Sequence, residues 1–505
     1  MPDTMKTITH VSLLLLPFFL ASAPPALSQS PPTASSTNSA TRLRVADAPE
    51  VRDALVKLDI WLEGQRLRYD LPGFSVGVVH DQELIWSKGY GFADLTNKIP
   101  ATDQTLYRVA SITKTFTATA VMQLVEQGKL SLEDPVSQHL PWFKPKDADP
   151  ARPVLVWHLL SHTGGLQREA PGTDWDQLEG PDISNVKSVT ADTPLSLPPQ
   201  TRLKYSNYGF TVAGELVAEI SRVPFPRYVQ ERILLPLGMT NSLLLEGTET
   251  RPGLAVPYGR RLGRQERGLE TQMNKQGILS AGGLVTNVRD LAKWASLQLN
   301  ESDEFKGPVL SGRSLREMHR PRFLVPDWSQ GWGIGWRLMR GEKRATIEHG
   351  GSLPGYKSKL LIDPASRAAV IVLVNADDGP ASDLAGGAMK IVSNPINKAA
   401  TPAEAPAAPA ADLARFEGLY RDRSGDCARV VVLSGKLRII DLETDDVETA
   451  TTTLKQIGPT TFRTEARDNA ITSGVESLIE FTMDASGRAA SVAFESGSYR
   501  MRRVE

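Results

Sequence analysis

The apolar residues between positions 51 and 86 follow two different spacings. The first group recurs three or four positions apart, as on one face of a helix, and consists of Val51, Leu55, Leu58 and Leu62. Two short apolar runs follow, Phe74–Val79 and Leu84–Trp86, with the polar pair Asp81-Gln82 between them. This pattern predicts a helix followed by a β-hairpin.

The same two patterns return further along the chain. Thr113–Gln127 has helical spacing and is followed by Gly128, a residue that commonly ends a helix. Ser358–Ile362 and Ala369–Asn375 have the pattern of a second hairpin, and Asp383–Val392 that of another helix. Strands from both ends of one domain, with a helical region between them, indicate an α/β plus all-α fold.

The last hundred residues have a different character. Thr401–Ala411 is almost wholly Ala, Pro and Glu, which is typical of a linker. After it, Arg429–Leu442, Thr461–Thr464 and Leu478–Phe494 alternate like strands, and Asp484–Gly487 has the composition of a turn. We therefore expect a small all-β antiparallel domain. The expected boundaries are 49–398 for the large domain, 399–412 for the linker and 413–505 for the β-domain.

The N-terminus has the layout of a secretory signal. Lys6 precedes the apolar run Val11–Leu20, which is short for a membrane span, and the small residues Ala26-Leu27-Ser28 follow. We expect a signal peptide over residues 1–28 and a flexible Ser/Thr/Pro/Ala leader over 29–48. The expected protein is exported to a bacterial periplasm or the medium, without stable membrane insertion once the signal is removed. An N-terminal membrane anchor is the alternative.

Composition narrows the classes of partner and cofactor. The 505 residues are 41% apolar and 23% charged, with a formal net charge of −1, which gives no indication of a nucleic-acid partner. The single cysteine, Cys427, excludes an intrachain disulfide and any cysteine-based metal site. The seven histidines lack His-Glu-x-x-His spacing, and no glycine loop of the phosphate-binding kind precedes a helix. We expect no metal and no cofactor, and oligomeric state is not indicated.

Ser111-Ile112-Thr113-Lys114 places a hydroxyl and an amine one helical turn apart on the same face. A serine hydroxyl becomes a strong nucleophile when a neighbouring base takes its proton, and a lysine of lowered pKa is such a base. Ser184 and Lys187 have the same spacing but lie in a polar, loop-like stretch. Ser111 opens a long apolar helix instead, and is the stronger candidate.

Two further motifs carry groups that suit acyl transfer. Tyr205 and Asn207 supply a phenol that can pass a proton and an amide that can orient a lysine or a substrate carbonyl. Read alone, they would be a buried aromatic residue with a turn residue.

The second motif, His349-Gly350-Gly351-Ser352, precedes the second hairpin. Its two glycines would let a substrate backbone lie against an edge strand. The N–H groups of Ser352 and Ser111 would form an oxyanion hole.

These three motifs occur in the order found in serine β-lactamases and penicillin-binding proteins, and Val51–Pro395 as a whole resembles the class C β-lactamase-like family. The further stretches that carry this resemblance are Leu159–Leu166, Ala281–Leu284 and Pro354–Tyr356. The resemblance implies an antiparallel sheet flanked by helices, with a helical subdomain. It also implies a serine hydrolase that forms an acyl-enzyme with a small-molecule or peptide substrate.

The roles follow from this resemblance and from the chemistry of each group. Ser111 attacks a carbonyl, and Lys114 with Tyr205 moves the proton. Asn207 positions the substrate and Lys114, and His349 binds the acyl side or relays a proton. A non-catalytic binding protein on this scaffold remains an alternative, although such a protein would be expected to lack these groups.

Two departures from the family pattern affect the expected substrate. Class C β-lactamases resemble this chain but carry Lys-Thr-Gly in place of His349-Gly350-Gly351, and Ala in place of Ser206. A histidine is charged only part of the time near neutral pH, which weakens the expected docking of a β-lactam carboxylate. Relatives with His-x-Gly resemble D-amino-acid peptidases and esterases, so we expect that activity, with a class C-like β-lactamase as the alternative.

Gly73-Phe74-Ser75-Val76-Gly77 matches the nucleophile elbow of α/β-hydrolases and offers a competing nucleophile, Ser75. That elbow requires a turn at the serine followed by a helix, whereas Ser75 lies within an apolar strand pattern. His162 is a possible base for such a triad. The pattern around His162 favours a helix end and turn, and a structural role.

Overall fold

The computed structural model describes residues 44–504, apart from 246–248, 264, 273, 275, 342–344, 401–412, 434, 442–450, 465–476 and 495–498. The predicted signal segment 1–28, most of the predicted leader 29–48 and the linker residues 401–412 lie outside the described residues. The last residues of that leader are helical, since they form η1 (Val45–Asp47). A helix-and-sheet part ends at residue 400, and a barrel begins after residue 412.

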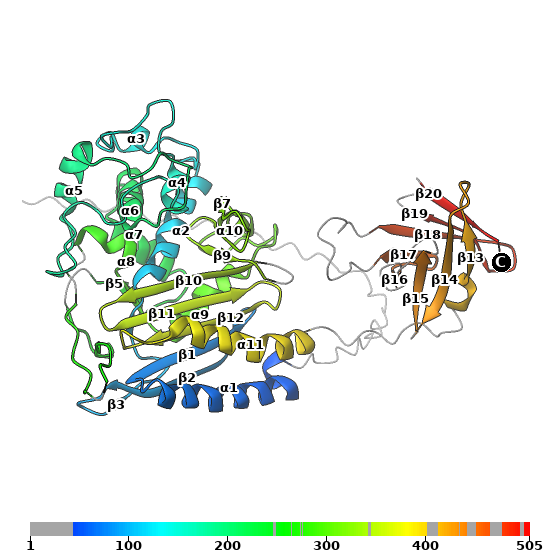
Figure 1. Ribbon diagram of the computed structural model, residues 1–505, viewed down its shortest axis with the longest axis horizontal. Coiled ribbons are helices and arrows are strands. Elements are labelled where there is room, and N and C mark those ends of the chain that lie inside the picture. Colours follow the sequence, from blue (N-terminus) through cyan, green and yellow to red (C-terminus); the bar gives the residue numbers. More distant parts are fainter. Residues whose placement is uncertain are drawn as a thin grey trace, which may run out of the picture. The chain divides into compact units, whose positions relative to one another are not determined.

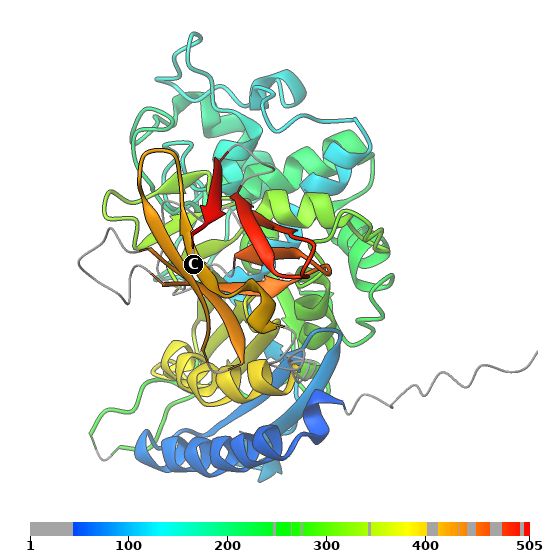
Figure 2. The same ribbon diagram turned by 90° about the vertical axis from the view of Figure 1, so that its right-hand side faces the viewer.

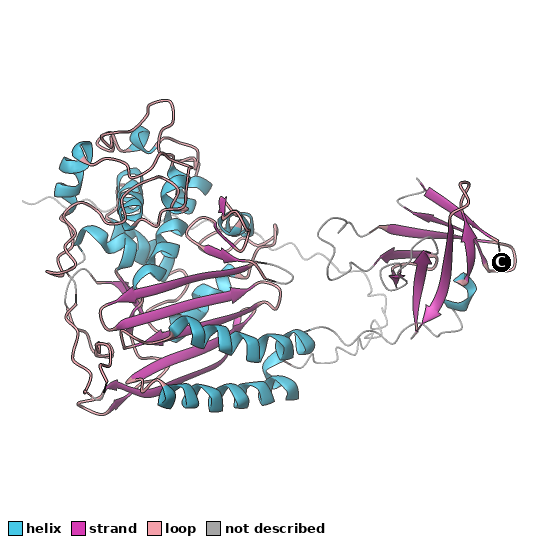
Figure 3. Cartoon of the chain, in the orientation of Figure 1, coloured by secondary structure: helices cyan, strands magenta, loops and turns pink. Residues whose placement is uncertain are grey.

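Nine of the described strands form one antiparallel sheet in the first part (Figures 1 and 3). In sheet order they are β3 (Ile99–Pro100), β2 (Glu83–Asp94), β1 (Gly73–His80), β12 (Ala368–Val374), β11 (Tyr356–Asp363), β10 (Thr346–Leu353), β9 (Arg337–Met339), β8 (Gln330–Trp332) and β7 (Phe323–Leu324). Both predicted hairpins are confirmed, as β1–β2 and β11–β12. Strands far apart in sequence meet at the β1–β12 pair, where Phe74 lies opposite Val374.

Helices cover both faces of this sheet. The predicted first helix is α1 (Pro49–Arg68), which lies beside α11 (Ala381–Ala400) on one face (Figures 1 and 2). On the other face lie α2 (Thr113–Glu126) and α9 (Val288–Gln298). β12 is buried along its whole length, because Val370 and Val372 face α1 and α11 while Ile371 and Leu373 face the other core.

The helix predicted after β12 is longer in the structure than the sequence pattern indicated. α11 continues past Val392 to Ala400, through Pro395 and into the segment expected to be linker. Ile396, one residue beyond the proline, is fully buried in the core formed with α1. This packing outweighs the hydrogen bond that a proline removes from a helix.

The regular structure of the segment between β3 and β7 is mainly helical, with long loops between the helices. Its helices are α2, α3 (Val136–His139), α4 (Val156–Leu160), α5 (Ile183–Val189), α6 (Asn207–Ser221), α7 (Phe225–Val229), α8 (Leu279–Gly282), α9 and α10 (Gly312–His319). A small sheet in the order β4 (Tyr107–Arg108), β6 (Leu284–Thr286) and β5 (Leu243–Leu244) joins this region to the start of α2. Among the helices that the structure describes, none combines the length and the apolar character needed to cross a bilayer.

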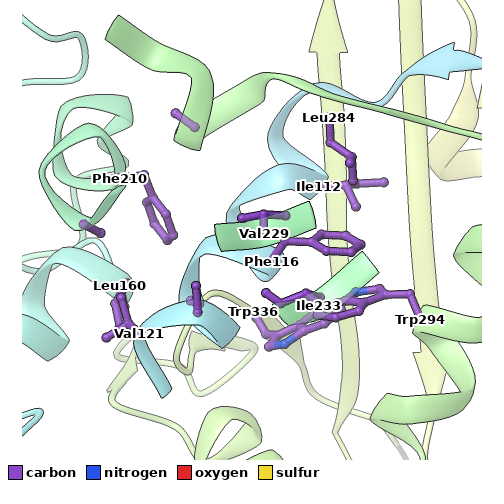
Figure 4. Packing of buried hydrophobic residues seen from close by; sticks show 14 of the residues in the cluster. Ile112, Phe116, Val121, Leu160, Phe210, Val229, Ile233, Leu284, Trp294 and Trp336 are labelled. Carbon is purple, nitrogen blue, oxygen red and sulfur yellow. The ribbon is translucent and has the colours of Figure 1, made fainter. Parts of the chain in front are cut away.

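α2 runs through the middle of the larger core. Every residue from Thr113 to Leu124 is buried, as expected for a helix with neighbours on all sides. Figure 4 shows Phe116 of α2 against Trp294 of α9, with their ring centroids 3.8 Å apart and the rings nearly parallel. A helix held on all sides in this way gives the residues of its first turn a fixed position.

The second part is a closed eight-stranded antiparallel barrel, which confirms the predicted β-domain. Its strands are β13 (Gly418–Arg421), β14 (Cys427–Leu433), β15 (Lys436–Asp441), β16 (Thr451–Gln456), β17 (Thr461–Thr464), β18 (Leu478–Met483), β19 (Ala489–Phe494) and β20 (Tyr499–Arg503). Aromatic rings fill part of its interior, where Phe416, Phe462 and Phe481 have centroids 4.9 to 5.5 Å apart. The alternation of apolar residues did not reveal β13, β16 or β20, which are short or mostly polar.

Candidate active site

The candidate nucleophile lies on a strained turn between a strand and a helix. β4 leads into the 3-10 turn η2 (Ala110–Ile112), and α2 begins at the next residue. Ala110 has φ +48, in the left-handed region, which is unfavourable by about 1–2 kcal/mol for a residue with a Cβ. Strain of this kind concentrates at functional positions. The turn leaves Ser111 half-buried, with its side chain in a cleft.

Lys114 lies directly beside this serine. Its Nζ is 3.0 Å from the Ser111 Oγ and donates to the Ala281 carbonyl oxygen at 2.7 Å. The lysine is 0% exposed, and this burial lowers its pKa well below the ordinary value. Glu169 raises that pKa and Arg168 lowers it, both less than burial does. Lys114 is therefore a buried amine that gives up its proton more readily than an exposed lysine, and it lies within hydrogen-bonding distance of a serine hydroxyl.

Tyr205 completes the group around Ser111. Its phenol hydrogen-bonds the Ser111 side chain, and the Lys114 Nζ lies 5.0 Å from its ring centroid. Burial raises the pKa of Tyr205 to about 12, although the hydrogen bond from Ser111 and the Arg168 guanidinium act in the opposite direction. The phenol therefore keeps its proton at neutral pH, while burial shifts the pKa of Lys114 in the opposite direction.

His162 supports the tyrosine from behind. Its ring stacks on the Tyr205 ring with centroids 4.1 Å apart, and its Nδ1 accepts a hydrogen bond from the Ser206 N–H at 3.0 Å. Burial lowers the pKa of His162 well below its ordinary value, so the ring is neutral. The geometry agrees with the structural role expected for this residue.

His349 lies inside a strand, where the sequence pattern indicated only a lead toward the hairpin. It is the fourth residue of β10 and is 4% exposed. Its Nδ1 lies 2.7 Å from the Gly350 carbonyl oxygen. Because a carbonyl oxygen only accepts, Nδ1 carries the proton, and Nε2 has a free lone pair. Nε2 is buried and has no hydrogen-bond partner among the described residues.

The expectation that His349 is partly charged near neutral pH was wrong. Burial lowers its pKa to about 3, with a further lowering from Lys114. The hydrogen bond to the Gly350 carbonyl opposes this shift, but is the smaller effect. His349 therefore presents an acceptor, and not a cation, to the cleft that it lines.

The two glycines of this motif serve different purposes. A Cβ at Gly351 would overlap the Val109 carbonyl oxygen and the Ser358 hydroxyl, so only glycine lets β10 lie against the turn that carries Ser111. At Gly350 the nearest atom to such a Cβ is 3.4 Å away. Gly351 thus has a packing role besides the predicted one, and both glycines line the cleft, where contact with a substrate backbone stays a prediction.

From His349 onward, the edge of β10 on the side of β9 has no neighbouring strand among the described residues, while the other edge stays paired with β11. β9 pairs with β10 only from Thr346 to Glu348, so the remaining half of β10 borders the cleft. Ser352 is exposed there, and its Oγ accepts a hydrogen bond from the Lys357 ammonium at 2.6 Å. The Ser111 and Ser352 positions thus line the same cleft.

Asn207 contacts a group that the sequence analysis did not identify. Its Nδ2 donates to both carboxylate oxygens of Glu169, at 3.0 and 2.9 Å. No hydrogen bond joins Asn207 to Lys114 in the part of the chain that the structure describes, so the predicted contact between them is absent. Glu169 lies three residues after the Leu159–Leu166 stretch, and only its closeness to that stretch could have indicated it.

The cleft has a volume of about 930 Å³ and receives side chains from both the sheet and the helical region. Trp332 of β8 forms one wall, with its ring centroid 4.6 Å from that of His162 and 5.8 Å from that of His349. Arg168 lies over the Tyr205 ring at 5.3 Å. Neither Trp332 nor Arg168 was predicted, because neither belongs to a short motif.

The two competing serines lie in other environments. Ser75 is fully buried within β1, where its hydroxyl donates to the Thr102 carbonyl oxygen at 2.6 Å. A serine in the middle of a strand is not a nucleophile elbow, so the α/β-hydrolase alternative was wrong. Ser184 lies in the helix α5, not in the expected loop, and Lys187 is paired with Glu215 at 2.6 Å.

An antiparallel sheet packed on a helical region, with serine, buried lysine and tyrosine side chains meeting between them, is the arrangement of serine hydrolases of the β-lactamase type. The chain belongs to the Beta-lactamase family, which matches residues 52–394. Both the suspected family and the predicted fold class are therefore confirmed.

Several known proteins are similar over long segments. Protein flp of Staphylococcus aureus (strain MRSA252) is 26% identical over 323 residues, which cover 64% of this chain and 63% of that protein. An octameric penicillin-binding protein homologue from Pyrococcus abyssi has a TM-score of 0.58 and 25% identity, over 88% of this chain and 99% of its own. A D-stereospecific amidohydrolase from Streptomyces sp. has a TM-score of 0.56 and 22% identity, over 66% and 97%.

The packing of Gly351 generates a direct test. Gly351→Ala should lower the free energy of unfolding by about 1–3 kcal/mol, the usual effect of overpacking, and should lower esterase activity by separating β10 from the Ser111 turn. Urea unfolding and kcat with p-nitrophenyl butyrate measure the two effects. Gly350→Ala is the control for the unfolding measurement, because a Cβ at Gly350 has space. Equal losses of unfolding free energy in the two variants would contradict this account of the packing.

Proposed function

We propose that the chain hydrolyses ester or amide bonds through an acyl-enzyme on Ser111, as a D-amino-acid peptidase or esterase. The observation that carries this proposal is the buried Lys114 amine, which lies 3.0 Å from the Ser111 hydroxyl and whose pKa burial lowers well below its ordinary value. A serine held beside an available base is the general requirement for nucleophilic catalysis.

The first step is the attack of Ser111 Oγ on the substrate carbonyl carbon, while the hydroxyl proton passes to Lys114 Nζ. The tetrahedral oxyanion accepts hydrogen bonds from the Ser111 and Ser352 N–H groups. The ammonium that forms on Lys114 is favoured by the nearby Glu169 carboxylate, which raises the pKa of this lysine.

Collapse of this intermediate breaks the bond to the leaving group and forms the acyl ester of Ser111. The leaving alcohol or amine takes a proton from the Tyr205 phenol, which hydrogen-bonds Ser111, and the Lys114 ammonium returns that proton to the phenol oxygen. Water then attacks the acyl ester with Lys114 as base again. Ser111 and the carboxylic acid product are released.

The neutral state of His349 supports an ester or peptide substrate over a β-lactam. Docking of a β-lactam carboxylate is favoured by a permanent cation at the position of His349, through a charge-assisted hydrogen bond. A ring whose pKa is about 3 offers no such charge near neutral pH. The likeness to a D-stereospecific amidohydrolase fits the same substrate range.

Removal of the nucleophile is the primary test. Ser111→Ala should abolish turnover of p-nitrophenyl butyrate and of D-amino-acid anilides, because among the described residues Ser111 carries the one aliphatic hydroxyl that is hydrogen-bonded to Lys114 Nζ. Ser184→Ala is the control and should keep wild-type activity. Labelling by a fluorophosphonate, located by peptide mass spectrometry, should fall on Ser111, and labelling of Ser75 would contradict the assignment.

The pH dependence tests the charge states. Turnover of p-nitrophenyl butyrate should rise with pH as Lys114 loses its proton, and should level off well below pH 10.5, because burial lowers the pKa of Lys114. The kcat/KM ratio of nitrocefin to butyrate should stay constant from about pH 5.5 to 8.5, since His349 is neutral throughout. His349→Lys should raise that ratio. A wild-type ratio that increases as the pH falls through about 6.5 would mean that His349 titrates there.

We also propose that the chain is exported, on the N-terminal pattern of Lys6, an apolar run and small residues. Intact-mass measurement of the protein from its native source should show a mature chain that starts near Gln29. Recovery of a full-length chain in the membrane fraction would contradict the proposal and favour an N-terminal anchor.

A further inference from the structure

Glu169 determines which side of the Asn207 amide reaches the cleft. A carboxylate has only acceptor atoms, so the Asn207 atom that lies 3.0 and 2.9 Å from its two oxygens must be the NH₂ group. The opposite orientation would place an amide oxygen against two carboxylate oxygens. Because the amide is planar, its oxygen is turned away from Glu169, and Asn207 lines the cleft.

The backbone around this pair holds the arrangement. The Asn207 N–H donates to the Arg168 carbonyl oxygen at 2.6 Å, and the Ser206 hydroxyl donates to the Gln167 carbonyl oxygen at 2.6 Å. Ser206 also caps α6, accepting from the Gly209 N–H at 2.9 Å. The segment before Glu169 and the segment before Asn207 are thus joined at several points, which leaves the two side chains little freedom.

The charge of Glu169 is balanced by its neighbour. The Arg168 Nε lies 3.3 Å from a Glu169 carboxylate oxygen, so the pair adds no net charge to the cleft. Recognition at this place therefore depends on hydrogen bonding more than on charge. The His349 Nε2 is a second acceptor without a partner among the described residues. Both groups offer lone pairs to a substrate.

We propose that Glu169 is a positioning residue that fixes the Asn207 amide with its oxygen toward the substrate, so that the enzyme selects acyl groups carrying a hydrogen-bond donor, such as a hydroxyl or amine near the carbonyl. This proposal rests on the proposed Ser111 hydrolase activity. In this orientation one N–H of the Asn207 NH₂ group is shared between the two Glu169 oxygens, and the amide oxygen is left as an acceptor for the substrate.

Two uncharged esters that differ in a single donor test the selection. p-Nitrophenyl 2-hydroxypropanoate carries an O–H group, and p-nitrophenyl 2-methoxypropanoate replaces it with a methyl ether that only accepts. The wild type should favour the hydroxy ester in kcat/KM by roughly tenfold, the effect of about one hydrogen bond, after correction for spontaneous hydrolysis. Each enantiomer is measured separately.

Substitution of Glu169 should change this preference without abolishing activity. In Glu169→Ala the Asn207 amide is free to turn its NH₂ group into the cleft, so the hydroxy-to-methoxy ratio should fall to about one or below. Glu169→Gln, which keeps the shape of the side chain, should lower the ratio partly. Glu215→Ala is the matched control, since Glu215 has the same 22% side-chain exposure and pairs with Lys187 away from the cleft.

Each outcome decides between the alternatives. An equal loss of activity on both esters in Glu169→Ala, with the ratio unchanged, would show a merely structural role and overturn the inference. So would a wild type that prefers the methoxy ester. Turnover of both esters that survives in Ser111→Ala, or no turnover by the wild type, would overturn the proposed function and this inference with it.

Discussion

Burial of the Lys114 amine without a directly bonded carboxylate is the constraint on which the rest of the site depends. A lysine that kept its charge would hold its proton and could not accept one from Ser111. Burial lowers the pKa of this amine because α2 is enclosed on all sides, with Phe116, two residues further along, packed on Trp294. The larger core thus supplies the catalytic base as well as stability.

The same enclosure sets the roles of the surrounding aromatic groups. Tyr205 is raised to a pKa of about 12 by burial against His162 and Trp332, so its phenol remains a proton donor while Lys114 is a proton acceptor. Two groups whose environments move their pKa values apart provide an acid and a base at one pH. β10 completes this arrangement, because Gly351 lets the strand lie directly against the turn before Ser111.

Asn207 and His349 each present a hydrogen-bond acceptor to the cleft, whereas the sequence suggested a donor for Asn207 and a partial positive charge for His349. Asn207 gives its NH₂ group to Glu169, and His349 gives its Nδ1 proton to its own strand, so each has a lone pair left for the substrate. The direction of these hydrogen bonds is set by Glu169 and by the Gly350 carbonyl, and neither group is hydrogen-bonded to Ser111 or Lys114. It supports substrates without a carboxylate beside the scissile bond.

The sequence by itself determined the features that depend on local geometry. Ser111 and Lys114 lie one helical turn apart, and the apolar pattern indicated both hairpins. Both features could be predicted because the periods of helices and strands are visible within short segments of sequence. Contacts between distant segments were decided only by the tertiary structure. Three contacts of this kind join residues that are not related by a helix or strand period. They are the Glu169–Asn207 pair, the packing of Trp332 on two histidine rings, and the close packing of Gly351. The charge of His349 follows from burial, and burial is a property of the whole fold.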